Sequence, residues 1–198
     1  MSKGQAIAIA VVVALISSTA TYLVAARRPA AVPSPAPVGS IREIMQHIVD
    51  PSSDGIFESV ATISGPNGIV EKAPKTDEDW EQVESYAWTL TEAATLLNVP
   101  GRLVAKPGDV DKPGDPSAPE LTAEQVQQKI EADRAKWASF VSGLQGAALK
   151  ALNAAQTHNT AALFEVGDTI DEACENCHLQ YWYPDNSKKA AAAPAPAR

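Results

Sequence analysis

The sequence predicts an all-α fold, an antiparallel four-helix bundle, from three observations. Apolar residues recur at steps of three and four along four segments, which is the period of helices buried on one side. Alanine is abundant in the second half of the chain and favours helices. Runs of β-branched residues are rare outside the N-terminus, so no strands are expected. Amphipathic helices of this length pack as a bundle, in which the end of the last helix lies beside the start of the first.

The first predicted helix begins at Ser40, because Ser40 and Glu43 match the S-x-x-E pattern of a capping box. Pro51 is expected to end or kink this helix, since proline cannot donate a helical hydrogen bond. A second short piece over Ser53–Ile63 is expected to resume it before the turn Gly65–Gly68. Four apolar residues share the buried face: Ile41, Ile44, Met45 and Ile48.

The second predicted helix starts at Thr76, with three acids in its first turn that favour the helix dipole, and Pro100-Gly101 stops it. The loop Val99–Glu120 is rich in Pro, Gly and Asp and long for a compact domain; it is either a variable insertion or a docking surface. The predicted seam consists of Trp80, Val83, Ala87, Leu90, Ala94 and Leu97.

The third predicted helix begins after Thr122 and runs to about Thr157, and the fourth runs from about Thr160 through His178. Leu163, Val166, Ile170, Cys174 and Cys177 lie along one face of the fourth helix, so the cysteines are expected on its core side. The apolar stripe of the third consists of Val126, Ile130, Trp137, Phe140, Val141, Leu144, Ala148 and Leu152.

Both ends of the chain differ in composition from this domain, which is expected to span residues 40–187. Residues 1–28 contain an uncharged, mostly apolar run, Ala6–Ala26, whose 21 residues fit either an uncleaved membrane anchor or a cleaved export signal. Residues 29–39 are rich in Ala and Pro and predict an extended tether. Residues 188–198 are also Ala/Pro-rich and predict a disordered tail. Under either interpretation of the N-terminus, the domain is expected to be exported from the cytoplasm.

Charge is distributed unevenly along the chain. The segment Val38–Ser187 holds 10 basic residues against all 24 acidic ones, a formal charge of −14 within a chain of net charge −8. An acidic domain argues against a nucleic-acid partner. It fits either simple solubility or a basic docking partner.

The chain's two cysteines and a histidine form one short motif, Cys174-Glu175-Asn176-Cys177-His178. This is the C-x-x-C-H pattern of a c-type haem attachment site. Two intervening residues on a helical turn place both thiols on one side, where each can add to one haem vinyl group. The imidazole of the next residue then reaches the iron. The sequence therefore predicts one covalently attached haem c, with Cys174, Cys177 and His178 binding it and His178 ligating its iron.

Two other uses of paired cysteines fit less well. A thioredoxin-like C-x-x-C lies at a helix N-terminus in a βαβ unit, whereas this pair closes a long helix. A structural zinc site needs four ligands, and no second ligand pair accompanies Cys174 and Cys177.

Iron held by His178 needs a second axial ligand or has an open face. Apart from the start residue, Met45 is the only methionine, and the predicted bundle puts it beside the haem. Met45 is therefore the expected second metal ligand, with ordinary core packing as the alternative. His47, two residues after Met45, points about 200° away from Met45 around the helix axis and is a weaker candidate for the second ligand. His158 lies about 30 Å before His178 on a continuous helix and cannot reach the iron.

This pattern resembles the class II cytochromes c, the cytochrome c′ family, over roughly Ser40–Tyr183. That family is a four-helix bundle with C-x-x-C-H near the end of its last helix. Its low-spin members take a methionine ligand from the first helix in an Arg-x-x-Met context, which Arg42–Met45 matches. The resemblance implies that Arg42 pairs with a haem propionate; a surface arginine of a first helical turn is the alternative. Pro51, the long loop and the segment Leu179–Pro184, which is rich in aromatic residues, depart from the family pattern.

The expected function is that of a periplasmic cytochrome that carries single electrons. His/Met ligation saturates the iron, and methionine raises the reduction potential. The alternative is a five-coordinate haem module that binds NO or CO. No catalytic constellation is apparent, so the chain is not expected to be an enzyme. The expected partners are redox proteins, basic or membrane-bound, with inner-membrane attachment through an uncleaved N-terminus; a homodimer is also open.

Overall fold

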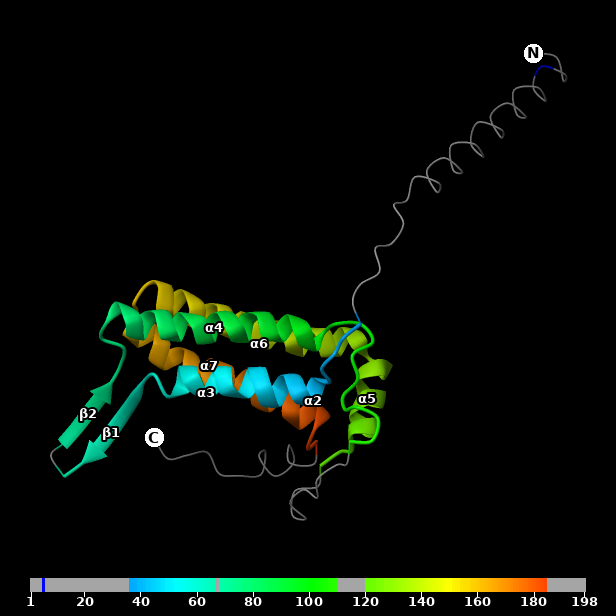
Figure 1. Ribbon diagram of the computed structural model, residues 1–198, viewed down its shortest axis with the longest axis horizontal. Coiled ribbons are helices and arrows are strands. Elements are labelled where there is room, and N and C mark those ends of the chain that lie inside the picture. Colours follow the sequence, from blue (N-terminus) through cyan, green and yellow to red (C-terminus); the bar gives the residue numbers. More distant parts are fainter. Residues whose placement is uncertain (1–4, 6–35, 67, 110–119, 185–198) are drawn as a thin grey trace. The chain divides into compact units, whose positions relative to one another are not determined.

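Helices run side by side through most of the part of the chain that the structure, a computed structural model, describes: residues 5, 36–66, 68–109 and 120–184 (Figure 1). The chain divides into two units, Met1–Ala36 and Pro37–Arg198. Of the first unit, only Gln5 and Ala36 are described. The predicted export segment, most of the tether and the C-terminal tail lie outside the described residues. The labelled helices and strands all belong to the second unit.

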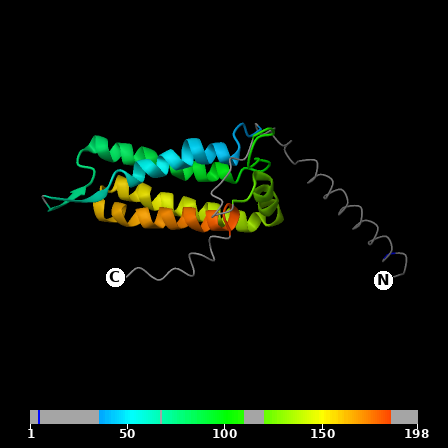
Figure 2. The same ribbon diagram turned by 90° about the horizontal axis from the view of Figure 1, so that it is seen from below.

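The described residues are mostly helical, so the prediction of an all-α class is confirmed at that level. Segments α2, η1 and α3 form one continuous helical stretch that contacts α4 and α7, while α6 contacts both α4 and α7 (Figures 1 and 2). Among the described residues, none of the helices combines the length and the apolar character needed to span a bilayer. The helical elements are α2 (Ile41–Ile44), η1 (Met45–Val49), α3 (Asp50–Phe57), α4 (Asp77–Leu97), α5 (Ala123–Ala132), α6 (Arg134–Gln156) and α7 (Thr160–Tyr181).

Capping boxes start the helices where the sequence places them. The Ser40 hydroxyl accepts a hydrogen bond from the Glu43 backbone N–H, and the Glu43 carboxylate accepts one from the Ser40 backbone N–H. Thr76 and Asp79 form the same reciprocal pair at the start of α4. Each box satisfies backbone donors that a helix N-terminus otherwise leaves unpaired. The predicted starts at Ser40 and Thr76 are therefore confirmed.

The core lies between the helices and is built from the predicted apolar faces. Trp137 of α6 is buried, and its indole N–H donates to the Leu97 carbonyl at the end of α4, 3.2 Å away. All six residues of the predicted α4 seam are buried. On the predicted stripe Val126–Leu152, all except Val126 and Phe140 are buried, and these two are half-buried against the core.

The described part of the loop after α4 packs against the start of α2. Leu103 and Val104 accept hydrogen bonds from the backbone N–H groups of Ile41 and Arg42, at 2.8 and 3.0 Å. The Lys106 ammonium binds the Glu43 carboxylate at 2.6 Å, and this hydrogen bond is the main reason why the pKa of Glu43 falls to about 2. The loop thus completes the first turn of α2.

Arg102, in the same loop, is buried and joins two helix ends. Its Nε donates to the Leu96 carbonyl at 2.7 Å, and its Nη1 donates to the Gly39 carbonyl. A cation at the C-terminus of α4 also complements the helix dipole there.

A β-hairpin replaces part of the predicted helix Ser53–Ile63, so that prediction is wrong beyond Phe57. Strands β1 (Ala61–Gly65) and β2 (Gly68–Lys72) pair antiparallel, with Ile63 opposite Val70. Neither face of the hairpin is buried, and Ile63, Ile69 and Val70 are 52–72% exposed. The Lys72 ammonium donates to the Glu58 carbonyl at 2.5 Å and holds the end of the hairpin to α3.

The third predicted helix is two helices. It starts after Thr122 as predicted, but α5 ends at Ala132 and α6 begins at Arg134. Asp133 lies between them outside helical geometry, with φ −147° and ψ 78°, and its carboxylate accepts a hydrogen bond from the Lys136 backbone N–H. Asp133 therefore acts as the N-cap of α6.

Candidate functional site

Helix α7 carries the C-x-x-C-H motif in its last two turns. The Asn159 side chain caps its start by accepting from the Ala162 backbone N–H at 3.0 Å. Leu163, Val166 and Ile170 bury the face that leads to the motif. The predicted helix from Thr160 through His178 is confirmed and extends to Tyr181.

Cys174 and Cys177 are free, half-buried thiols on the core side of α7. Both pack against the apolar core, as predicted from the periodicity. His178 follows them and is also half-buried. One turn of helix thus presents two thiols and an imidazole.

A hollow of about 220 Å³ separates this turn from the helical stretch that contains Met45. Met45 lies on one wall, and Cys174 and His178 lie on the wall made by α7; Cys177 packs toward the core and is not part of the lining. Residues far apart in the sequence therefore meet at one place, which is where the bundle prediction put Met45. The lining consists of Met45, Val49, Asp50, Ser53, Asp54, Phe57, Asp171, Cys174, Glu175 and His178.

Met45 opens a π-helical turn, η1, instead of lying in a regular α-helix. The helix continues through Pro51 into α3, so of the two expected effects, an end or a kink, the helix end is wrong. A π turn contains one residue more than an α turn, which makes room for a proline ring that would otherwise clash with the carbonyl four residues earlier. Val49, which the predicted face omitted, is buried as a result of this change in register.

Burial sets the protonation state of the motif. It raises the pKa of the Cys174 thiol to about 11, with the charges of Asp171, Asp50 and Glu175 adding to the rise. It raises the pKa of the Cys177 thiol to about 12. Burial also lowers the pKa of His178, against the opposing charges of Glu175 and Asp50. At neutral pH the structure therefore holds protonated thiols and a neutral imidazole, whereas thioredoxin-like cysteines have a lowered pKa.

Aromatic residues after the motif contact its histidine. Trp182 and Tyr183 contact the His178 ring, with centroids 5.1 and 5.8 Å apart. The Tyr183 hydroxyl donates to the Glu175 carboxylate at 2.7 Å. Tyr181 is buried and packs edge-on against Trp137.

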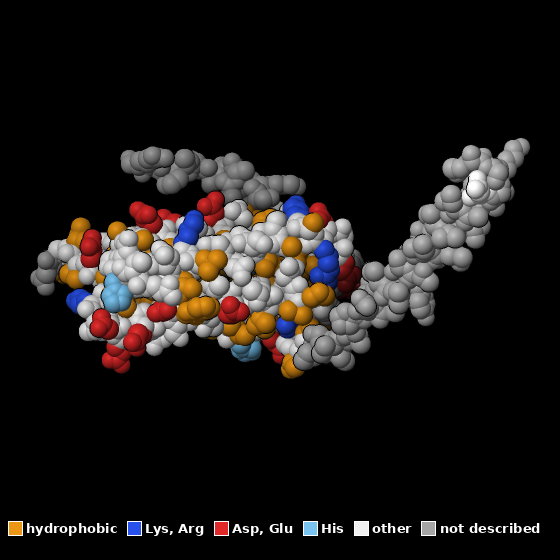
Figure 3. Space-filling view, turned by 90° about the horizontal axis from the view of Figure 1, so that it is seen from above, with side chains coloured by type: hydrophobic (Ala, Val, Ile, Leu, Met, Phe, Trp, Pro, Cys, Tyr) orange, Lys and Arg blue, Asp and Glu red, His pale blue; other side chains and the backbone are white. Residues whose placement is uncertain are grey.

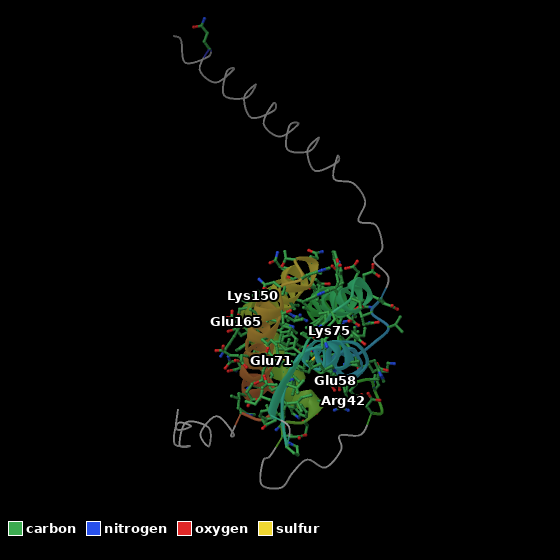
Figure 4. All side chains as sticks on the ribbon, turned by 90° about the vertical axis from the view of Figure 1, so that its left-hand side faces the viewer. Arg42, Glu58, Glu71, Lys75, Lys150 and Glu165 are labelled. Atoms are coloured by element: carbon green, nitrogen blue, oxygen red, sulfur yellow. The ribbon has the colours of Figure 1, made fainter. Side chains whose placement is uncertain are left out.

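The other candidate residues of the sequence analysis lie outside the hollow. Arg42 is half-buried in α2, and Figure 4 shows it on the opposite side of the molecule from Lys150 and Glu165. His47 is exposed in η1. His158 is exposed in the turn before α7, where its ring stacks on Trp80 at 5.0 Å.

Comparisons of the chain with protein-family models, curated proteins and solved structures gave no match. The site must therefore be interpreted from its own chemistry.

The residues around the hollow fit the predicted haem in their donor set. A neutral imidazole and a thioether, the side chains that ligate iron in His/Met cytochromes, line the two walls. The Ser53 hydroxyl, also in the lining, is buried without a hydrogen-bond partner among the described residues. The hollow is smaller than the about 300–1,000 Å³ of typical ligand sites, so its walls must separate to admit a group of that size.

A metal site built only from protein side chains finds no support in the described part of the chain. No group of three or more His, Cys, Asp or Glu side chains there is arranged to hold an ion.

Val49, Ser53 and Tyr183 are among the residues at the site that sequence analysis missed. Ser53 follows Met45 by eight residues, a spacing that could have placed both on one side of a helix. The π turn between them changes the angle that this spacing represents, so ordinary helical periodicity did not identify Ser53. Tyr183 belongs to the aromatic segment noted in the sequence, but no sequence pattern predicts its hydrogen bond to Glu175.

Proposed function

We propose that this chain is a c-type cytochrome that carries single electrons, with haem c attached to Cys174 and Cys177 and its iron ligated by His178 and Met45. The observation that supports this most strongly is the shared hollow. The only methionine of the second unit lines it opposite Cys174 and His178, although Met45 and the motif lie on different helices.

Bound haem would supply an iron that alternates between two oxidation states. The two thiols tether the porphyrin, and the lowered pKa of His178 leaves its ring nitrogen available as a ligand. A thioether ligand from Met45 completes the coordination, favours the reduced state and excludes other molecules from the iron. The part played by the protein is thus ligation and burial of the haem.

We assign the domain to the antiparallel four-helix bundles of the class II cytochrome c type. The assignment is supported by the mutual contacts of α3, α4, α6 and α7 and by the position of the motif near the end of the last helix. By its resemblance to that family, Arg42 of this chain would pair with a haem propionate.

The protein is proposed to work in the periplasm, exported or anchored to the inner membrane by its N-terminal segment. Covalent haem attachment outside the cytoplasmic membrane agrees with the apolar run Ala6–Ala26. Acidic side chains are spread over the face shown in Figure 3. The formal charge of −14 over Val38–Ser187 fits either solubility or docking of a basic redox partner. A homodimer remains within the proposal.

Optical spectroscopy of the haem-loaded protein tests this function. Wild type matured with a c-type haem system should be low-spin, with the weak far-red band of a methionine–iron bond. Met45→Ala should lose that band and bind CO, while His47→Ala, two residues away and exposed, should keep it. A high-spin wild type that binds NO or CO readily would favour the five-coordinate gas-binding module instead.

A further inference from the structure

The π turn that begins at Met45 contains one surplus residue. The Asp50 backbone N–H donates to the Met45 carbonyl, five residues earlier, where an α-helix would use a carbonyl four residues earlier. Regular α-helix flanks the turn on both sides, in α2 and α3. The turn is therefore equivalent to one residue inserted into an otherwise continuous helix.

Burial on the two sides of the turn shows why the extra residue is retained. Ile44 and Val49 are both buried, at 7% and 3% exposure, although they lie five residues apart. Beyond the turn, the buried positions return to ordinary helical steps, from Val49 to Ser53 and then Ile56. A regular α-helix would point the two buried sets in different directions, so it cannot turn both toward the core. The π turn gives up one backbone hydrogen bond, and burying several aliphatic side chains outweighs that loss.

Both flanks are also held by neighbouring segments. Ile41 and Arg42 are hydrogen-bonded to Leu103 and Val104 of the loop after α4. Gly55 in α3 lies directly against the Tyr86 ring of α4. The register between α2 and α3 is thus fixed from outside the turn.

The π turn changes the direction in which Met45 points relative to the hollow wall, compared with a regular α-helix of the same sequence. At about 100° per residue, an uninterrupted α-helix would place Met45 about 80° from Ser53 and about 120° from Phe57 around the axis. With the π turn counted as one residue fewer, both angles fall to about 20°. Met45, Ser53 and Phe57 accordingly line the same hollow.

We infer that the π turn Met45–Val49 is the positioning element of the axial methionine: by taking up one surplus residue, the turn keeps Met45 in the wall that faces His178. This inference rests on the proposed function. It assigns the role to register, so Met45 must share a helix face with Ser53 and Phe57, and the identity of exposed Gln46 does not matter.

Deleting Gln46 together with Pro51→Ala tests the inference. The deletion removes the surplus residue, and the substitution lets the segment close as a regular α-helix with the same faces aligned. The double variant should keep the far-red methionine–iron band and its thermal midpoint, although it has lost a residue from a ligand-bearing helix. Loss of the band in this variant overturns the inference.

Two matched controls complete the experiment. Inserting one alanine after Gln46 adds a second surplus residue and should abolish the band. Deleting exposed Glu172 from the regular turn before Cys174 should abolish it as well, because no surplus residue is available there. If either control keeps the band, register does not control ligation and the inference is wrong.

The wild-type spectrum separates the two claims. A wild type without the methionine–iron band contradicts the proposed function, and the inference falls with it. A wild type with the band, combined with a double variant that lacks it, contradicts the inference alone.

Discussion

Gly55 of α3 lies directly against the ring of Tyr86 in α4: a β-carbon at Gly55 would come within 2.5 Å of the ring. Gly55→Ala should therefore push α3 away from α4 and lower the free energy of unfolding by about 1–3 kcal/mol. Urea denaturation measures this. Gly143→Ala, where the added carbon would lie more than 4 Å from every atom outside its own stretch of helix, should instead raise stability by about 0.5–1 kcal/mol.

A double-mutant cycle with Tyr86→Ala distinguishes contact from helix propensity. If the ring is the obstacle, Gly55→Ala should cost much less once Tyr86 has been truncated. An unchanged cost would mean that the close approach does not determine the packing of α3 on α4.

Neighbouring aromatic residues at the end of α7 should differ sharply in their effect on stability. Tyr181 is 4% exposed and packs on Trp137 and Phe140, so Tyr181→Ala should cost about 3–5 kcal/mol. Trp182 is 42% exposed, so Trp182→Ala should cost about 1 kcal/mol or less. Chemical denaturation of both variants provides the comparison, and equal losses would contradict the assigned burial.

The N-cap of α4 should contribute a pH-dependent stability. Backbone N–H groups of Lys75 and Thr76 donate to the Asp79 carboxylate and lower its pKa below the ordinary 3.8. The folded state then binds fewer protons than the unfolded chain, so this contribution is complete well above pH 3.8 and is lost as the pH falls through the lowered pKa.

Asp79→Asn should consequently be less stable than wild type at about pH 6, with the difference shrinking toward about pH 3. Thermal melts across this range measure it. Glu78→Gln, in the same first turn, controls for the loss of one charge near the helix N-terminus. A difference between wild type and Asp79→Asn that does not change with pH would show that the cap acts without titration.

Covalent attachment should require at least one of the two cysteines. Cys174→Ala and Cys177→Ala should each retain haem on a denaturing gel through the remaining thioether, whereas the double variant should lose it. Intact mass of the separated protein gives the same answer independently. Haem that stays covalently bound to the double variant would show that attachment occurs elsewhere in the chain.

Periodicity and caps predicted the helical faces because burial on one side leaves a clear period. Periodicity failed at Asp133 for a specific reason: Ile130 and Trp137 are seven residues apart, two turns of helix, so the buried stripe continues across the break between α5 and α6. The hairpin Ala61–Lys72 was missed because neither face is buried, and only the four residues Ala61–Ser64 alternate between apolar and polar.

The site was predictable where it is local and less so where it depends on register. Cys174, Cys177 and His178 lie on one turn, and their spacing alone specifies the motif. Met45 followed from the topology of the helices. The path of the chain through Pro51 did not, because proline is compatible with a helix end, a kink or a π turn, and the contacts on both sides decide among them.

The hydrogen bonds between Ile41, Arg42 and the loop at Leu103–Val104 have a consequence for the order of folding. The first turn of the segment that carries Met45 is completed by residues such as Lys106, which lies 63 positions after its partner Glu43. Such distant pairing forms slowly, whereas the turn that holds both cysteines and His178 forms from neighbours alone. Under the proposed function, Cys174 and Cys177 would thus be in place for haem attachment while the methionine side of the hollow is still open.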